Sequence, residues 1–145
     1  MNNSTTFSCI INSTDFTANI GIEICLDQLQ IFNSDHIDSI INFNYPVNDD
    51  DAEHEINFIM KNKTIDHNRV DENGNILQDV CLTIDHLAFD GIEIGHNVVE
   101  QIIYKHNFNG TQPEVTDKFY GKMGCNGTVS LKFTTPIYLW LLEHM

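Results

Sequence analysis

The stretch DVCLTIDHLAFDGIEI, residues 79–94, carries the pattern that decides the fold. Its apolar residues alternate with polar ones, which is the period of a strand that is buried on one side. The alternating residues are Val80, Leu82 and Ile84 and then, in the opposite phase, Leu87 and Phe89. A one-residue change of phase within a strand is typical of a β-bulge, so we expect a bulge near His86.

Four further segments repeat this period of two, and turn signals separate them. Alternating apolar residues occupy 20–26, 56–60, 92–94 and 129–133. Stretches rich in Asn, Asp and Gly lie between them, at 44–53, 71–75, 89–91, 107–110 and 124–127. Short strands at this spacing predict one all-β domain over residues 1–145, an antiparallel β-sandwich of jelly-roll type with at most one or two short helices.

Two segments could be helical. Residues 34–43, SDHIDSIINF, could form a short helix that Ser34 caps. Its inward side would then carry Ile37, Ile40 and Ile41. Residues 97–108, NVVEQIIYKHNF, fit a helical apolar stripe as well as they fit a strand that is buried on both sides.

Charge and cysteine usage exclude several classes of partner. Seven basic and twenty-one acidic residues give a formal net charge of −14, which repels nucleic acid and anionic membranes, so we expect neither as a partner. The opening MNNSTTFSCIINST lacks the basic and apolar regions of a signal peptide. The four cysteines are too scattered to indicate a zinc site or a disulfide framework, and we expect Cys25 and Cys81, within apolar runs, to be buried thiols.

The stretch VDENGNILQD, residues 70–79, fits two interpretations. The residue order does not match an EF-hand calcium loop, whereas Asp-Glu-Asn-Gly between two apolar residues is typical of a hairpin turn. A wider window nevertheless offers many of the oxygen ligands that calcium prefers. These are Asn62, Asp66, Asn68, Asp71, Asn73 and Asp79.

The segment from Asp79 to Ile94, with the loop before it, resembles calcium-dependent xylan-binding carbohydrate-binding modules over about residues 62–94. Asp79 matches their opening aspartate, Asp85 the aspartate within the strand, and Asp90-Gly91 the closing turn. The resemblance implies a jelly-roll sandwich in which a loop-bound calcium ion chelates sugar hydroxyls. From the oxygen-rich window, the calcium ligands we predict are Asn62, Asp66, Asp71 and Asp79. Where those modules carry Asn-Asp and Arg-Asn pairs, this chain has Asn62-Lys63 and Val80-Cys81.

The order D-E-N-G-N-I, then an aspartate, then I-D-x-L-x-F-D-G-I also resembles small β-sandwich proteins of tailed, T4-like bacteriophages of marine bacteria. This resemblance implies an accessory component of a virion, either a capsid decoration or a tail or baseplate attachment. Such a protein would be made in the host cytoplasm and would bind other virion proteins. We take this as the first functional prediction, with calcium-dependent carbohydrate binding as the alternative.

Aromatic residues give the remaining candidate contacts. The ending TTPIYLWLLEHM, residues 134–145, is expected to form a strand that is apolar on both faces, which must be covered by the core or by a partner. Its predicted partner-binding residues are Tyr138, Trp140 and Leu142. Three aromatics near predicted loops could instead stack on sugars, and these are Tyr45, Phe119 and Tyr120.

Catalysis has little support in the sequence. The chain contains no G-x-S-x-G elbow, H-E-x-x-H helix or glycine-rich phosphate loop. Glu53 and Glu55 fall on one face of a possible strand and could act as an acid and base pair, although such pairs are more often solvated edges. We therefore predict a binding protein and not an enzyme.

Overall fold

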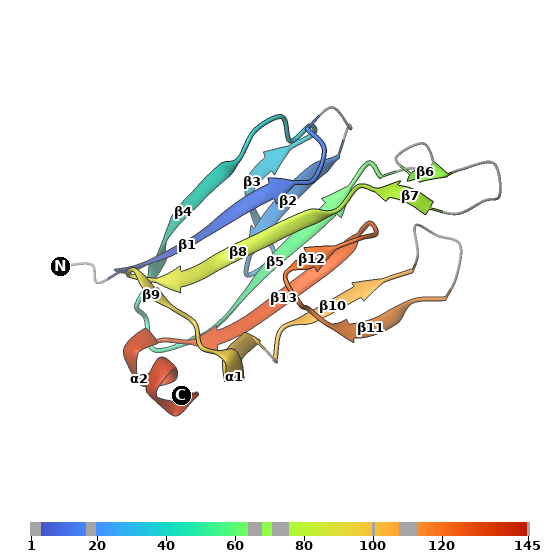
Figure 1. The fold of residues 1–145 in the computed structure, drawn as a ribbon. Coiled ribbons are helices and arrows are strands. Elements are labelled where there is room, and N and C mark those ends of the chain that lie inside the picture. Colours follow the sequence, from blue (N-terminus) through green and yellow to red (C-terminus); the bar gives the residue numbers. More distant parts are fainter. Residues whose placement is uncertain are drawn as a thin grey trace.

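The protein is an antiparallel β-sandwich, as the sequence predicted. The computed structural model describes residues 4–16, 20–63, 68–70, 76–99, 101–107 and 113–144. Two large sheets lie face to face with the core between them (Figure 1), and each strand pairs with its neighbours in the antiparallel direction. Alternation along the strands turns one set of side chains inward and the other outward.

The first sheet has five strands. Its main path runs β12 (Lys122–Met123), β8 (Leu82–Phe89), β1 (Ser4–Ser13) and β4 (Ile41–Asn48), and β9 (Ile92–Glu93) pairs with β8. The second sheet has six strands, in the order β11 (Val115–Lys118), β10 (Ile103–His106), β13 (Gly127–Thr134), β5 (Glu53–Lys61), β2 (Gly21–Leu26) and β3 (Leu29–Ser34).

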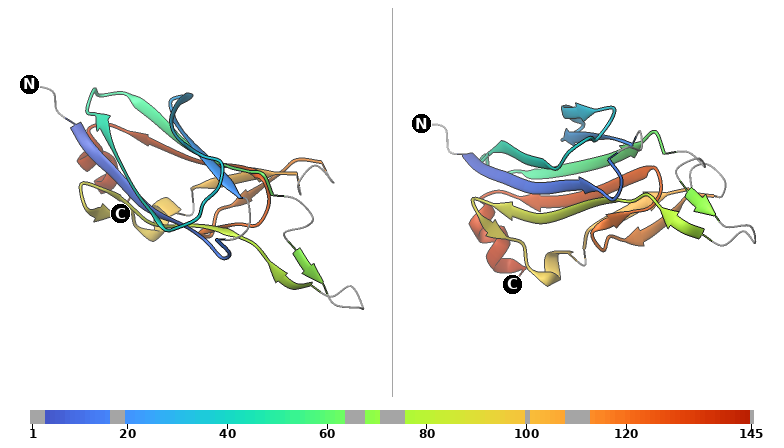
Figure 2. Two further views of the ribbon diagram at one scale, coloured as in Figure 1. Left: turned by 90° about the horizontal axis from the view of Figure 1, so that it is seen from above. Right: turned by 45° about the horizontal axis from the view of Figure 1, so that its top comes forward.

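The predicted hairpin around residues 70–79 is confirmed. Strands β6 (Asn68–Val70) and β7 (Ile76–Asp79) pair with each other as a separate two-stranded sheet. This hairpin extends beyond one end of the sandwich, away from the helices (Figure 2). Its turn, residues 71–75, lies outside the described residues.

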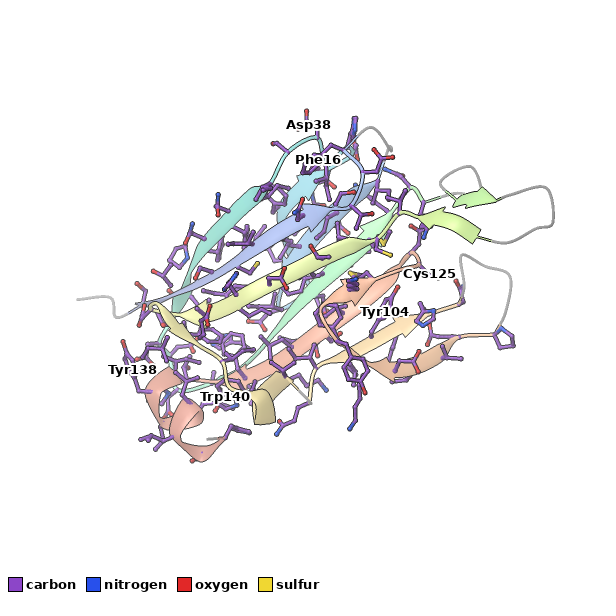
Figure 3. All side chains as sticks on the ribbon, viewed as in Figure 1. Phe16, Asp38, Tyr104, Cys125, Tyr138 and Trp140 are labelled. Atoms are coloured by element: carbon purple, nitrogen blue, oxygen red, sulfur yellow. The ribbon has the colours of Figure 1, made fainter. Side chains whose placement is uncertain are left out.

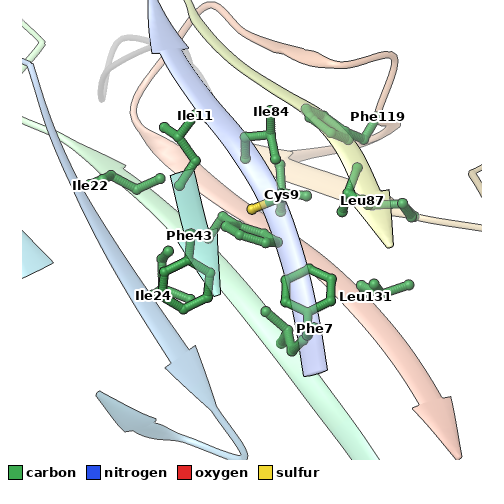
Figure 4. Close-up of a cluster of buried hydrophobic side chains, with 14 of the residues drawn as sticks. Phe7, Cys9, Ile11, Ile22, Ile24, Phe43, Ile84, Leu87, Phe119 and Leu131 are labelled. Carbon is green, nitrogen blue, oxygen red and sulfur yellow. The ribbon is translucent and has the colours of Figure 1, made fainter. Parts of the chain in front are cut away.

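The core is formed by aromatic and aliphatic side chains from both sheets (Figure 4). Phe7 is fully buried, and its ring centroid lies 5.2 Å from that of Phe89 in the same sheet and 6.2 Å from that of Phe58 in the opposite sheet. Phe89 in turn lies 4.9 Å from Phe133. These contacts join the two sheets, because rings from each insert between those of the other.

The bulge expected near His86 is confirmed. The step from Ser8 to Ile10 on β1 is matched by the longer step from Ala88 to Asp85 on β8, so β8 contains the extra residue. His86 has a φ of 55°, in the left-handed region, which is uncommon for a residue other than glycine and marks the irregular backbone at this point. The change of apolar phase in the sequence is therefore the direct trace of this bulge.

Two short helices, α1 (His96–Val99) and α2 (Ile137–Glu143), lie at one end of the sandwich (Figure 1). The prediction of a C-terminal strand was wrong. Ile137, Trp140 and Leu141, the buried residues of α2, have the spacing of one helical face. An apolar stripe of helical period therefore covers the end of the core here.

The other local predictions had mixed outcomes. The predicted helix over residues 34–43 was wrong, because this segment is the connection from β3 to β4, in which Ile37 donates its backbone N–H to Ile20 at 2.8 Å. Residues 97–108 contain both alternatives, the end of α1 and then β10. The sequence did not predict β1, β3, β4, β11 or β12. Cys25 and Cys81 are only partly buried, whereas Cys9 is 3% exposed. No helix within the described residues has the length and apolar character to span a bilayer.

Candidate functional site

A hollow of about 250 Å3 lies beside the bulge of β8. Its lining comes from the bulge of β8, from Glu93 and Ile94, and from residues 119–121. Val99, at the end of α1, and Ile102 complete it. Three backbone hydrogen bonds hold these segments together: Ile84 N–H to Gly121 at 3.0 Å, Ile94 N–H to Leu87 at 3.0 Å, and Phe119 N–H to Ile102 at 3.0 Å. The hollow is thus built into the sheet and does not depend on one loop alone.

The floor of this hollow is apolar and its rim is polar. The apolar lining consists of Ile84, Leu87, Ile94, Val99, Ile102 and Phe119. On the rim lie Asp85, His86, Glu93 and Tyr120, all of them exposed. Small-molecule sites commonly combine an apolar surface with a few oriented polar groups.

Tyr120 is the main exposed aromatic of the hollow. Its side chain is 82% exposed, the highest value among the large apolar residues of the described chain, although Phe119 next to it is 2% exposed. The backbone between them therefore sends one ring into the core and leaves the other available to a ligand. An exposed tyrosine offers an apolar ring face and a hydroxyl that hydrogen-bonds.

The polar rim carries one close charge pair. His86 Nδ1 lies 2.6 Å from Glu93 Oε1, and the hydrogen bond and the negative charge of Glu93 raise the pKa of His86 above its ordinary value. Asp85 adds a second, smaller contribution in the same direction. The rim therefore presents carboxylate oxygens that accept hydrogen bonds, next to an exposed imidazole.

The structure brings some of the predicted glycan-binding residues together. Phe119 and Tyr120 lie with Asp85 around the hollow, but Phe119 is a packing residue of its floor and not an exposed platform. Tyr45 is half-buried on β4, at the other edge of the five-stranded sheet, and its ring stacks on Phe43 with centroids 6.4 Å apart. His86, Glu93 and Ile94 were not predicted as site residues, because only the bulge and the β8–β9 turn place them beside Tyr120.

The predicted calcium ligands are only partly within the described residues. Asp66 and Asp71 lie outside them, and of Asp79 only the backbone, paired with Asn68, is described. Asn62 has a φ of 72° and donates its side-chain amide to the carbonyl of Asp35 at 3.1 Å. Across the part of the chain that the structure describes, no three His, Cys, Asp or Glu side chains are grouped as metal ligands.

Lys63 anchors the start of the same loop. Its side chain is 4% exposed and donates to the carbonyl of Gly124, and its backbone N–H donates to Asn126 Oδ1 at 3.0 Å. A buried ammonium beside Asn62 opposes a divalent cation at this point. The described side chains therefore do not form a set of ligands that fits a calcium ion. Calcium binding stays a prediction that depends on the side chains of Asp66, Asp71 and Asp79.

The predicted partner-binding residues lie on α2 and differ in exposure; Figure 3 labels Tyr138 and Trp140. Trp140 is 5% exposed and packs edge-on against Phe89 and Phe133, at centroid distances of 6.1 and 6.2 Å. Tyr138 and Leu142 are 53% and 68% exposed. Trp140 is thus part of the core, and only the other two are available to a partner.

Glu53 and Glu55 line a wider hollow of about 610 Å3, which contains His54. His54 contacts Asp27 through Nδ1 at 2.6 Å and Asp50 through Nε2 at 2.7 Å, so both of its ring nitrogens are engaged. Glu55 lies 3.8 Å from Lys132. An imidazole whose two nitrogens both bond to carboxylates stabilises the structure. Neither nitrogen is free to accept a proton from a substrate.

Comparisons with known proteins show the class of fold. No family model matches the chain, and no curated protein matches it. The chain is similar to a solved carbohydrate-binding module, described as "vCBM60 in complex with galactobiose", with a TM-score of 0.50 and 11% sequence identity. The similarity covers 89% of this chain and 97% of that one. At this identity the likeness shows a shared β-sandwich fold. None of these comparisons supports the virion prediction, which stays a prediction.

Proposed function

We propose that this protein is a non-catalytic carbohydrate-binding module, and that its site is the hollow beside the bulge, with Tyr120 as the stacking platform. The single observation that carries the proposal is an 82% exposed tyrosine next to a formed hollow with a polar rim. The apolar faces of sugar rings stack on aromatic side chains, and sugar hydroxyls donate hydrogen bonds to carboxylates. The rim supplies both, because Tyr120 stands beside Asp85 and Glu93.

The similar fold of a module that was solved with galactobiose supports the proposal. The size of the hollow also suits a small sugar. Its volume of about 250 Å3 is slightly below the range of sites that hold larger, drug-sized ligands. We therefore expect the hollow to hold one sugar unit. The net charge of −14 disfavours acidic sugars, because uronates and sulfated sugars would be repelled.

Calorimetric titration with neutral di- and oligosaccharides, galactobiose and xylobiose among them, tests the proposal. The Tyr120→Ala variant is expected to bind about tenfold more weakly or not at all, a loss of about 1.4 kcal/mol or more. Tyr138→Ala is the matched control, because it removes another exposed tyrosine at a different place on the surface. Equal binding by wild type and Tyr120→Ala would refute this site.

The same titration with and without EDTA tests the predicted role of calcium. Loss of binding in EDTA, together with loss in Asp79→Ala, would assign binding to a calcium site at the 62–79 loop. Binding that is unchanged in EDTA and lost in Tyr120→Ala would assign it to the hollow. The two sites thus give different results in one experiment.

The second candidate function is docking onto a larger assembly, which the first functional prediction placed in a phage virion. One observation favours docking of some kind: Tyr138, Leu139 and Leu142 are each more than half exposed on one short helix. Exposed apolar groups of this kind are common at protein interfaces. A monodisperse monomer with no affinity for any virion protein in pull-down would refute it.

A further inference from the structure

The outward sides of β1 and β4 carry no charged residue. Along β1 the outward residues are Ser4, Thr6, Ser8, Ile10 and Asn12, and along β4 they are Asn42, Asn44, Pro46 and Asn48. Neither strand contains an Asp, Glu, Lys or Arg at any position, in a chain that has twenty-one acidic and seven basic residues. We call this surface the uncharged face.

The opposite outer surface of the molecule is different. Outward positions of the six-stranded sheet carry charges of both signs on four of its strands. These residues are Glu23, Glu55, Lys61, Lys105 and Lys132. Outward positions of the sandwich are therefore not uncharged in general, and the lack of charge is a property of β1 and β4, since β8 and β12 of the same sheet carry Asp85 and Lys122.

Strand pairing makes the uncharged face continuous with the Tyr120 hollow. Ile10 pairs with Asn42 on one side and with Asp85 on the other, so these three outward residues form a row across three strands. Asp85 lines the hollow, and its neighbour Ile84 is hydrogen-bonded to Gly121 at 3.0 Å. The row therefore runs from Tyr120 and Gly121 at one edge of the sheet to β4 at the other.

The chemistry of the uncharged face matches an uncharged, hydroxyl-rich polymer. Asn side chains and Ser and Thr hydroxyls both donate and accept hydrogen bonds, as sugar hydroxyls do, and Ile10 provides an apolar contact in the middle. Three strand spacings of about 4.8 Å give a width of roughly 14 Å from β12 to β4, enough for several sugar rings. A single sugar in the hollow would leave this width unused.

We propose that the uncharged face extends the Tyr120 hollow into a binding surface for a neutral polysaccharide chain, which lies across the strands from Tyr120 over Ile10 to Asn42 and Asn44. This inference rests on the proposed function and names its substrate class. Acidic polysaccharides are excluded by the charge of the protein, since the rim of the hollow itself carries Asp85 and Glu93.

The edge position of β4 raises a competing explanation for its lack of charge. β4 ends the main path of its sheet, and exposed edge strands usually carry charges, Lys above all, that prevent pairing with another chain. β4 has Pro46 but no charge. Self-association through β4 is the competing explanation, and the test below separates it from polysaccharide binding.

The test is a chain-length series of neutral xylo- and galacto-oligosaccharides, from two to six residues, titrated into wild type and three variants. Wild type is expected to gain about tenfold or more in affinity between two and six residues. Ser8→Glu and Asn44→Glu are expected to remove this gain and to leave disaccharide affinity unchanged. Thr128→Glu adds the same charge on the outer side of the opposite sheet and is expected to change neither. A uronate polymer is expected not to bind.

The possible outcomes separate the inference from the function on which it rests. Disaccharide binding that depends on Tyr120, with no gain in longer chains or with a gain that survives Ser8→Glu, overturns the extended face and leaves the hollow intact. Concentration-dependent dimers that Asn44→Glu abolishes, without a gain in longer chains, also overturn it. No binding at any chain length overturns both. Circular dichroism of each variant confirms that it is folded.

Discussion

The outer sides of the two sheets face solvent from the same core, yet they differ in charge. The six-stranded sheet presents Glu23, Glu55, Lys61 and Lys132, and Lys61 pairs with Asp35 at 2.8 Å. The five-stranded sheet presents amides and hydroxyls on β1 and β4. Both sheets bury the same kind of inward residue, so folding places no demand on the outward set beyond solubility. The difference is the basis of our proposal that the uncharged face of β1 and β4 binds a neutral polysaccharide.

The largest expected effect comes from breaking the core that both sheets share. Phe7→Ala removes a fully buried ring that contacts Phe58 across the sandwich, and we expect unfolding free energy to fall by about 3–5 kcal/mol. Urea denaturation followed by tryptophan fluorescence measures it, because Trp140 is buried in the folded protein. A fall below about 1 kcal/mol would mean that the sheets do not pack as described.

The next largest effect concerns the hydrogen bonds through which Asp90 connects β1 to α2. Asp90 accepts hydrogen bonds from the Thr6 N–H at 2.7 Å, the Thr5 hydroxyl at 2.8 Å and the Tyr138 hydroxyl at 2.8 Å. We expect Asp90→Asn to destabilise the protein by about 1–2 kcal/mol. Tyr138→Phe, which removes one of the three bonds, is expected to cost less. Equal stability of Asp90→Asn and wild type would contradict this assignment.

The ionisation of Asp90 makes the strength of these hydrogen bonds depend on pH. Burial raises the pKa of Asp90, but the hydrogen bonds from Thr6, Tyr138 and Thr5 outweigh it and hold the pKa below the ordinary value of 3.8. A lowered pKa in the folded state means that the stabilisation is present above about pH 4 and is lost as the pH falls further. The stability difference between wild type and Asp90→Asn should therefore shrink below pH 4.

In the six-stranded sheet, the contacts of His54 with Asp27 and Asp50 stabilise the protein with the opposite pH dependence. Burial lowers the pKa of His54, but hydrogen bonds to Asp27 and Asp50 outweigh it and hold the pKa above 6.5. A raised pKa means that this stabilisation is complete below pH 6.5 and is lost as the pH rises through the folded value. Denaturation of wild type and His54→Gln between pH 6 and 9 measures it. A difference that stays constant over this range would show that His54 does not titrate as described.

The smallest expected effects are single truncations on the two outer sides. Asn44→Ala on β4 and Glu23→Ala on β2 both change solvent-facing side chains, and each should alter stability by no more than about 0.5 kcal/mol. Only Asn44→Ala is expected to weaken the binding of long neutral oligosaccharides. Equal effects of the two variants on binding would remove the proposed distinction between the two outer sides.

Local pattern was enough to predict the strands with strong alternation. The segments 20–26, 56–60 and 129–133 became β2, β5 and β13, and the change of phase in 79–94 became the bulge. The opening strand β1 was not predicted although Phe7, Cys9 and Ile11 alternate, because the Ser, Thr and Asn residues between them are also typical of loops. The C-terminal helix was missed because six apolar residues in a row fit either period.

The candidate site was harder to predict than the fold. The sequence indicated Asp85 and the adjacent pair Phe119 and Tyr120 separately, more than thirty residues apart. It also gave no reason to place Tyr45 at a different site from this pair. The hydrogen bond from Ile84 to Gly121 places Asp85 beside Tyr120, and the order of strands places Tyr45 at the far edge. Pairing partners and register are long-range choices that a local pattern does not specify.

The sequence by itself determined that the chain folds as an antiparallel β-sandwich with a bulge near His86, because the period of apolar residues selects which side of each strand leaves water. Only the tertiary structure decided which outward residues become neighbours. The pairing of β1 with both β4 and β8 joins Asn42, Ile10 and Asp85 into one row that reaches the Tyr120 hollow. Outward residues have no burial energy to mark them in the sequence, so their role depends on the register that the buried residues impose.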